Sequence, residues 1–408
     1  MAKTCLKCGN TLEDTAKFCP KCGSEYGAVP TCVKCGQKLT ANDRFCPNCG
    51  ADQNGKKPSP AGAGEDYIKK GFDTFASAIN TMAGESGQVE IHLKDLYSEV
   101  FKNHTQEEKD ELFVCGTGKT TPKESEMIAE WPRPWLYARV FLMFAVVFAG
   151  LYFMSMSLHN SNTFPGAMFV GALLVPLTVI IFFWEMNVPR NISIMDVVSV
   201  FFVGGVLSLV LTMLLSEIFP STSFDLAGAA LIGIVEEVSK ALAVAYYIKK
   251  RNPKYKLNGL LLGACVGGGF AVFETAGYAF NTLISTNSLS AMMHTLFLRG
   301  VLAIGGHVVW AAISGFGLIV AKGDAPLQTN HLLSAKFLKF LVLVIALHAA
   351  WDWSMPFITT QTQQNLKYAV LVLIPVAMVL VLLSAGLQQV STIVQKAQAE
   401  ERAAGSRL

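Results

Sequence analysis

The chain has 408 residues, of which 52% are hydrophobic and only 15% charged, and its formal net charge is +3 at pH 7. This composition excludes a single soluble globule, and the apolar excess is unevenly spread. Residues 1–133 are polar, whereas residues 136–387 carry repeated apolar runs of about 20 residues, long enough to span about 30 Å of hydrocarbon as helices. The net charge excludes little, because the basic residues of the apolar half lie mostly in short loops.

Eight of the ten cysteines lie in the first 50 residues, as two copies of one motif. Each copy reads CxxC–x10–CxxC, and each cysteine of the second copy follows its counterpart by 27 residues. Paired CxxC motifs are typical of tetrahedral structural zinc, whereas disulfide cysteines rarely repeat in this way. We therefore predict a double zinc ribbon in residues 1–50. It would bind two structural zinc ions through Cys5, Cys8, Cys19, Cys22, Cys32, Cys35, Cys46 and Cys49.

The ribbon surface favours a protein partner over nucleic acid, because its basic residues are few and interspersed. Residues 51–64 have the composition of a flexible linker, and we assign residues 65–133 to a juxtamembrane region in the cytoplasm. Within this region, Thr105 and Glu108 have the spacing of a capping box that opens a helix.

Residues 134–390 form the predicted membrane domain and residues 391–408 a cytoplasmic tail. Eight apolar runs in the domain have the length of transmembrane helices. They cover residues 136–158, 164–184, 197–219, 225–248, 257–283, 301–320, 337–353 and 368–387. The sequence therefore predicts an all-α polytopic membrane protein with about eight transmembrane helices, preceded by a small zinc-stabilised double zinc-ribbon domain.

Loop charges predict the orientation of this domain. Basic residues gather in the loops after the second, fourth and sixth runs and are nearly absent from the other loops. The positive-inside rule then places both termini in the cytoplasm, in a multi-pass protein of the plasma membrane. The cytoplasm is also the reducing compartment that zinc-binding thiols need.

Glycines recur every fourth residue in the fifth run, at Gly259, Gly263 and Gly267. Small residues at this spacing let two helices approach closely in lipid. We expect them to serve helix packing; the alternative is a hinge or a broken helix beside a functional site.

Ionisable residues occur inside the apolar runs, where each costs several kcal/mol unless it is paired. Glu236 and Glu237 lie in the fourth run, and Lys240 follows one turn later, within reach of either carboxylate. Two neighbouring carboxylates in unlike surroundings suit general acid–base catalysis on water. The alternative is a buried ion pair that only fixes helix packing.

Further ionisable residues follow on the next three runs, at Glu274, His307 and His348. Asp352 lies one turn after His348, so it can accept a hydrogen bond from that imidazole and fix its tautomer. At a rise of about 1.5 Å per residue, Glu236 and His348 fall near the middle of the membrane, with Glu274 and His307 in its outer half. We therefore expect these side chains to converge in one layer.

In this order, the motifs E-E-x-x-K, F-x-x-x-E, H-x-x-W and H-x-x-x-D resemble the PrsW family of intramembrane proteases, which is related to the CAAX prenyl endopeptidases and bacterial Abi proteins. The resemblance covers roughly residues 136–390. It implies a membrane-embedded peptidase whose paired glutamates activate water. The family also suggests cleavage of a membrane-bound anti-sigma factor as a task, but the ribbons at residues 5–49 lie outside the family pattern, so the same substrate is not implied here. The residues that it marks are Glu236, Glu237, Lys240, Phe270, Glu274, His307 and His348, with Asp352 in support.

The expected chemistry is hydrolysis of a peptide bond in a membrane-anchored protein, in the lipid bilayer. Glu236 or Glu237 takes the proton from water, and we favour Glu236. The two imidazoles either stabilise the oxyanion or, together with Glu274, hold a metal that activates the water. No HExxH motif is present, which favours a metal-free glutamate mechanism. We assign Phe270, Tyr278 and Trp310 to substrate binding.

Two other classes of protein explain the same buried charges. One is a transporter or proton pathway, but such proteins often carry inverted repeats, and the polar residues here gather in the fourth to seventh runs instead. The other is a degenerate peptidase kept as a binding scaffold, which is disfavoured because every motif position is filled. Convergence of the five residues Glu236, Glu237, Glu274, His307 and His348 would distinguish the peptidase from both.

Overall fold

The computed structural model describes residues 3–4, 11–12, 60–85, 87, 89–221 and 223–405, with side chains from residue 69 onward. The chain forms two compact units, Met1–Asp73 and Thr74–Leu408. In the first, strands β1 (Lys3–Thr4) and β2 (Thr11–Leu12) pair antiparallel. The eight cysteines of the predicted ribbons lie outside the described residues.

The second unit is helical, as the sequence predicts. It begins with the end of α1 (Pro60–Ala83), followed by the short helix η1 (Leu93–Leu96), α2 (Gln106–Phe113) and η2 (Glu124–Glu126). The predicted capping box at α2 is confirmed: Glu108 N donates to Thr105 Oγ1 at 3.2 Å, and Thr105 N donates to Glu108 Oε2 at 2.8 Å. Both groups belong to the first turn, where a helix has no backbone acceptors for its N–H groups.

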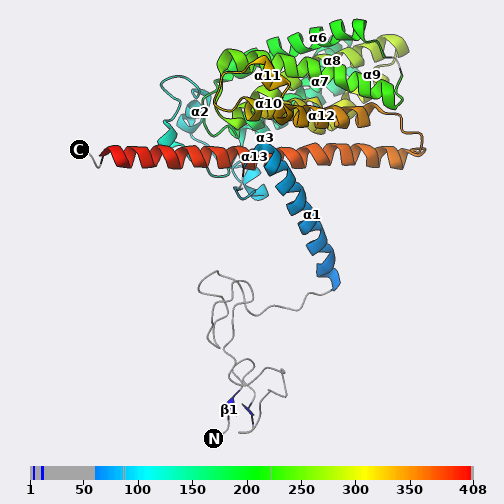
Figure 1. Cartoon of the computed structure of the whole chain (residues 1–408). Coiled ribbons are helices and arrows are strands. Elements are labelled where there is room, and N and C mark those ends of the chain that lie inside the picture. Colours follow the sequence, from blue (N-terminus) through cyan, green and yellow to red (C-terminus); the bar gives the residue numbers. More distant parts are fainter. Residues whose placement is uncertain are drawn as a thin grey trace. The chain divides into compact units, whose positions relative to one another are not determined.

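All eight predicted apolar ranges are mainly helical (Figure 1), but the sixth, residues 301–320, is interrupted by a turn at Gly306. The helices from the first range onward are α3 (Leu136–Met156), η3 (Ser161–Thr163), α4 (Phe164–Glu185), α5 (Ile194–Ser199), the π-helix η4 (Val200–Gly204), α6 (Gly205–Ile218), α7 (Leu226–Arg251), α8 (Lys256–Thr286), α9 (Leu289–Leu302), η5 (Ala303–Gly305), α10 (His307–Lys322), α11 (Thr329–Leu332), α12 (Ala335–Asp352) and α13 (Gln361–Gly405).

Six helical segments among the described residues are long and apolar enough to cross a membrane. They are Leu136–Met156, Ser161–Glu185, Ile194–Ile218, Lys256–Thr286, Leu289–Lys322 and Gln361–Ala404. Helices α7 and α12, of 26 and 18 residues, cover the two remaining predicted ranges. Both are at least about 27 Å long at 1.5 Å per residue, and both carry the charged side chains of the predicted site.

Two features of the bundle differ from the expected pattern. Helix α9 lies where the sequence indicated a loop before the sixth run, and it packs against α8 and α4. Helix α13 has 45 residues and continues through the predicted tail to Gly405, although it contains Pro375. It contacts α8, α10 and α12, and Figure 1 shows it running along one edge of the bundle.

Helix α8 lies at the centre of the bundle, and its glycines bring it into backbone contact with α10. A Cβ at Gly263 would lie 2.1 Å from the Ala311 carbonyl oxygen, and one at Gly267 would lie 2.2 Å from that of His307. Any larger residue would therefore push the two helices apart. The glycine spacing serves helix packing, and it fixes the first residue of α10, His307, against α8.

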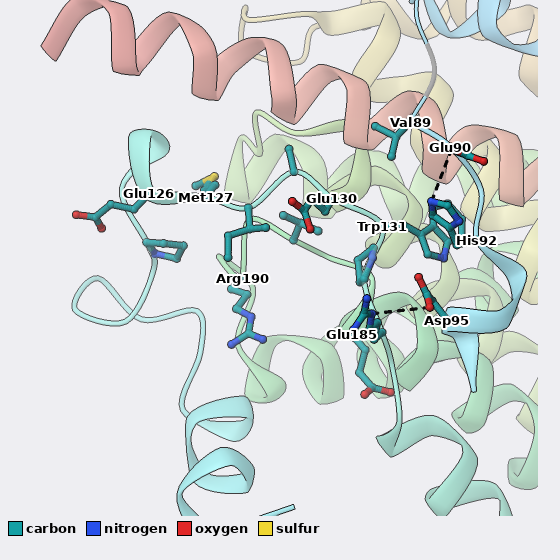
Figure 2. Close-up of a pocket in the computed structure, with 16 residues that line it drawn as sticks. Val89, Glu90, His92, Asp95, Glu126, Met127, Glu130, Trp131, Glu185 and Arg190 are labelled. Atoms are coloured by element: carbon teal, nitrogen blue, oxygen red, sulfur yellow. Dashed lines mark ion pairs between the residues drawn. The ribbon is translucent and has the colours of Figure 1, made fainter. Parts of the chain in front are cut away.

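The start of α3 is bound to Glu185, the last residue of α4, at one end of the bundle. The Glu185 carboxylate accepts hydrogen bonds of 2.8, 2.9 and 2.8 Å from the first N–H groups of α3, at Trp135, Leu136 and Tyr137. A cavity of about 880 Å³ lies beside this contact. Figure 2 shows the side chains that line it, both acidic and basic, among them Glu130 and Arg190. The cavity lies at the ends of the helices where the basic loops gather, the predicted cytoplasmic end.

Candidate active site

Helix α7 places a buried cation between its two glutamates. The Lys240 side chain is fully buried, and its Nζ lies 2.6 Å from Glu237 Oε1 and 3.5 Å from Glu236 Oε2. The three residues lie on adjacent turns of one helix, so each carboxylate is within reach of the ammonium. The ammonium also lies 4.4 Å from the centroid of the Phe270 ring on α8, where the negative face of the ring attracts a cation.

The two glutamates have different surroundings. Glu237 is fully buried, and its Oε1 accepts hydrogen bonds from Lys240 and, at 2.8 Å, from Nδ1 of His348. Glu236 is 13% exposed and lines a cavity. Its Oε2 lies 3.8 Å from Nε2 of His348 and 3.9 Å from Nδ1 of His307. Glu237 therefore belongs to the protein interior, whereas Glu236 faces the cavity.

His307 is bound on both sides of its ring. Its Nδ1 lies 2.8 Å from Lys240 Nζ, and its Nε2 lies 3.1 Å from Glu274 Oε2. Because an ammonium can only donate, Nδ1 accepts and Nε2–H donates to Glu274, which defines the neutral Nε2–H tautomer. Glu274 thus fixes the orientation of this ring.

Glu274 has a second partner that the sequence analysis did not identify. Arg299 Nη2, on α9, donates to the same Glu274 oxygen, and Arg299 Nε donates to Thr275 Oγ1 at 3.1 Å. In the sequence, Arg299 is a lone basic residue at the border of an apolar run. A basic residue in a predicted outer loop, where the positive-inside rule expects few, was the available signal.

His348 lies between two carboxylates. Asp352 Oδ2 is 3.3 Å from its Nε2, and Glu237 accepts from its Nδ1. We expected Asp352 to fix the tautomer of His348; in the structure, the shorter contact is the 2.8 Å hydrogen bond that His348 Nδ1–H donates to Glu237. The Trp310 ring stacks on the imidazole, with centroids 4.8 Å apart. These contacts leave the ring little freedom to rotate.

The cavity beside Glu236 has a volume of about 490 Å³. Its walls come from the ends of α6 and α12, from α7, α8 and α9, and from the start of α10 and α13. Of the residues assigned to substrate binding, Tyr278 and Trp310 line it, although Trp310 is itself only 1% exposed. Phe270 does not line it and packs behind Lys240 and His307. The cavity lies at the end of the bundle opposite the basic loops.

The site also contains a candidate metal-binding group. One ligand atom each from Glu236, His307 and His348 lie within 4.8 Å of one another. Two imidazoles and a carboxylate are a donor set that zinc accepts in hydrolytic enzymes, so the residues fit a metal. Glu274, which we expected as the third ligand, is instead bound to His307 and Arg299. Lys240 would have to release Nδ1 of His307 for that nitrogen to bind a metal.

Two parts of the chain match known families. Residues 193–383 match the family described as PrsW family intramembrane metalloprotease, and residues 5–50 match the double zinc ribbon. The first match contains every ionisable residue of the site described above, and both agree with the resemblance seen in the sequence. No curated protein and no solved structure matches the chain.

Proposed function

We propose that this chain, of which residues 193–383 match the PrsW family of intramembrane metalloproteases, cleaves a membrane-anchored protein at the cavity beside Glu236. The family indicates a peptide hydrolase in the lipid bilayer with a membrane-protein substrate. The observation that most supports this cavity is the convergence of Glu236, His307 and His348 from three helices around one space. Regulated proteolysis of a single-span protein is the task that we infer.

Glu236 is the residue that we assign to the attacking water. It is the cavity-facing member of the pair, and its Oε2 lies 3.8 and 3.9 Å from the two imidazoles. That spacing leaves room for one atom in contact with all three groups, such as a water oxygen within reach of a general base. Glu237 and Lys240 lie behind it, where Glu237 holds His348 in place and Lys240 holds His307.

The same three residues, Glu236, His307 and His348, would hold a divalent metal. When bound, such a metal lowers the pKa of a water ligand and polarises the carbonyl of the substrate. The residues around them retain their roles: Glu274 orients His307, and Glu237 and Asp352 orient His348. Ring orientation by carboxylates of this kind is typical of histidines at metal sites.

Orientation in the plasma membrane follows from the basic loops, which we place in the cytoplasm together with both termini. The cavity then faces the outer side. A cysteine introduced at Ser221, on the cavity wall, should react with an impermeant thiol reagent added to intact cells. A cysteine at Lys250, in the last turn of α7, should react only after the cells are opened. The reverse pattern would overturn this orientation.

The experiment that tests the function is Glu236→Gln in full-length protein, assayed in proteoliposomes with a panel of fluorogenic single-span peptides. Glutamine keeps the size of the side chain but cannot act as a base, so we expect cleavage to fall by about 10²–10⁴-fold. The matched control is Glu217→Gln, an exposed residue near the end of α6, which should retain activity.

Cleavage by Glu236→Gln at the parent rate would show that the site is wrongly assigned. A parent protein that cleaves no peptide of the panel, but dissipates a proton gradient across the same vesicles in a Glu236-dependent manner, would favour the transporter.

Zinc content tests the metal sites. The ribbons should hold about two zinc ions per chain, one for each set of four cysteines, and Cys5→Ser should remove one of them. A third ion that is lost in His348→Ala would identify the group around Glu236 as a metal site. Two ions in both proteins would favour the metal-free glutamate mechanism. The absence of zinc from the parent would reject the ribbon prediction. We expect the ribbons to bind a protein partner.

A further inference from the structure

Helix α9 carries a charged residue that no motif of the sequence marks. The helix buries Met292, Met293 and Leu296 against the bundle, while Phe297 and Val301 are exposed. Arg299 is 29% exposed and lines the active-site cavity. Arg299 lies within Leu289–Lys322, a segment of the structure long and apolar enough to cross a membrane, where a cation has a high cost unless it is paired, so its contacts indicate what it does.

Arg299 contacts three residues on the wall of α8. Its Nη2 donates to Glu274, its Nε donates to Thr275 Oγ1 at 3.1 Å, and its guanidinium carbon lies 4.3 Å from the centroid of the Tyr278 ring. The planar guanidinium presents its donors in a fixed geometry, so these contacts hold both the position and the orientation of the Glu274 carboxylate.

The Glu274 oxygen that Arg299 holds, Oε2, is also the acceptor for Nε2–H of His307 at 3.1 Å. The opposite nitrogen of that ring, Nδ1, faces Glu236 Oε2 at 3.9 Å. The geometry points to Arg299 as a positioning residue: through Glu274 it sets the ring of His307, and thereby the space between His307 and Glu236. This inference rests on the proposed protease function of the same site.

A second role for an exposed arginine in this cavity would be direct contact with the substrate. The two roles differ in kinetics. Loss of a positioning residue lowers kcat, because the reacting groups are misaligned, and leaves KM nearly unchanged; loss of a substrate contact raises KM. The hydrogen bonds that Arg299 donates to Glu274 and to Thr275 belong to one network. A variant of Thr275 should therefore reproduce part of the effect of an Arg299 variant.

The test compares Arg299→Ala, Arg299→Lys and Thr275→Val in full-length protein with the peptide panel that the parent cleaves. Changes to residues that orient a histidine typically cost about 10–100-fold, and we expect this fall in kcat for Arg299→Ala, with smaller falls for the other two. Methylguanidinium, which can enter the cavity that the truncation opens, should restore part of the kcat of Arg299→Ala. The control is His294→Ala, an exposed residue of the same helix, which should match the parent and gain nothing from methylguanidinium.

An unchanged kcat in Arg299→Ala, or a change confined to KM, would overturn the positioning role while leaving the protease function intact, provided that Glu236→Gln is inactive. If Arg299→Ala does not fold, Arg299→Lys and Thr275→Val carry the same kinetic comparison.

A readout independent of cleavage is the imidazole ¹⁵N spectrum of histidine-labelled protein in detergent, with His307 assigned by His307→Gln. The parent should show the Nε2–H tautomer at His307, and Arg299→Ala should show a mixture of tautomers. Identical His307 signals in the two proteins would reject the inference even if the parent cleaves no peptide of the panel.

Discussion

The two halves of helix α8 differ in almost every physical respect. All residues from Lys256 to Val272 are buried, and the glycines in this half place its backbone against that of α10. Beyond Glu274 the helix is packed less closely on one face. Tyr278 is 51% exposed, and a Cβ at Gly277 would have no atom within 4 Å. One continuous helix thus forms a rigid seam with the backbone of α10 and also provides one wall of an open cavity.

The position of the boundary between the halves shows how the site is built. Gly267 contacts the carbonyl oxygen of His307, the first residue of α10, so the seam ends where the site begins. Interiors packed at this density do not deform continuously. The seam therefore fixes the backbone of His307, and the open half leaves Glu274 free to contact groups from α9 and α10. Stability and chemistry depend on different ends of the same helix.

The largest effect on stability is expected within the site itself, from Glu237→Gln. Lys240 would lose its nearest carboxylate, at 2.6 Å, while remaining fully buried. Removal of one partner from a buried ion pair typically costs about 3–5 kcal/mol. The free energy of unfolding in detergent should fall by this amount, whereas Glu236→Gln should stay near the parent because Glu236 lies 3.5 Å from the ammonium and faces the cavity. Equal stability of the two variants would contradict the division between an interior and a cavity-facing glutamate.

The comparison between the halves of α8 is tested directly by Gly263→Val. The new Cβ would lie 2.1 Å from the carbonyl oxygen of Ala311, which belongs to the backbone and cannot move aside. Overpacking of this kind costs about 1–3 kcal/mol or more, so the thermal unfolding temperature should fall and less folded protein should be recovered.

Gly277→Ala, on the same helix, is the matched control. Nothing lies within 4 Å of its new methyl group, and the helix propensity of alanine should stabilise the protein by up to about 1 kcal/mol. A destabilised Gly277→Ala, or a neutral Gly263→Val, would show that the two halves do not differ as described.

Much of this architecture could be predicted from the sequence. The apolar runs identify the helices, and the glycine spacing identifies their close packing, because both depend on local periodicity. The four motifs identify the residues that converge, because charge has a high cost in lipid. We favoured Glu236 as the base, but the sequence offered no physical basis for deciding which of the two glutamates faces the cavity. Glu236 and Glu237 are adjacent on a helix, so only the packing of α10 and α12 determines which of them faces the cavity.

Helix α9 was missed for a related reason. It has only 14 residues, too few to cross a membrane alone at about 1.5 Å per residue, and the sequence between the fifth and sixth runs therefore resembled a loop. Arg299 was missed with it, because its partners Glu274 and Thr275 lie 24 or 25 positions away in the chain. A contact of this kind depends on how α9 folds back onto α8.

The smallest effect is expected just before α8, at the exposed ion pair between Lys254 and Glu124. The Glu124 carboxylate accepts a 2.7 Å hydrogen bond from Lys254 and a 3.1 Å hydrogen bond from the Tyr255 hydroxyl. The hydrogen bond from Lys254 holds the pKa of Glu124 below its ordinary value of 4.5. A carboxyl group whose pKa is depressed in the folded state stabilises the protein above its ordinary pKa, and this contribution disappears as the pH falls through the folded-state pKa.

Glu124→Gln should therefore lower stability by about 0.2–1 kcal/mol near neutral pH, the range for exposed ion pairs, and the difference from the parent should vanish as the pH falls below 4.5 and through the folded-state pKa of Glu124. Thermal unfolding across this pH range measures it. Glu130→Gln, an exposed carboxylate of the same segment, is the control and should follow the parent at every pH. A difference that persists at the lowest pH would mean that Glu124 acts through packing, and the contact between this segment and the start of α8 would not depend on its charge.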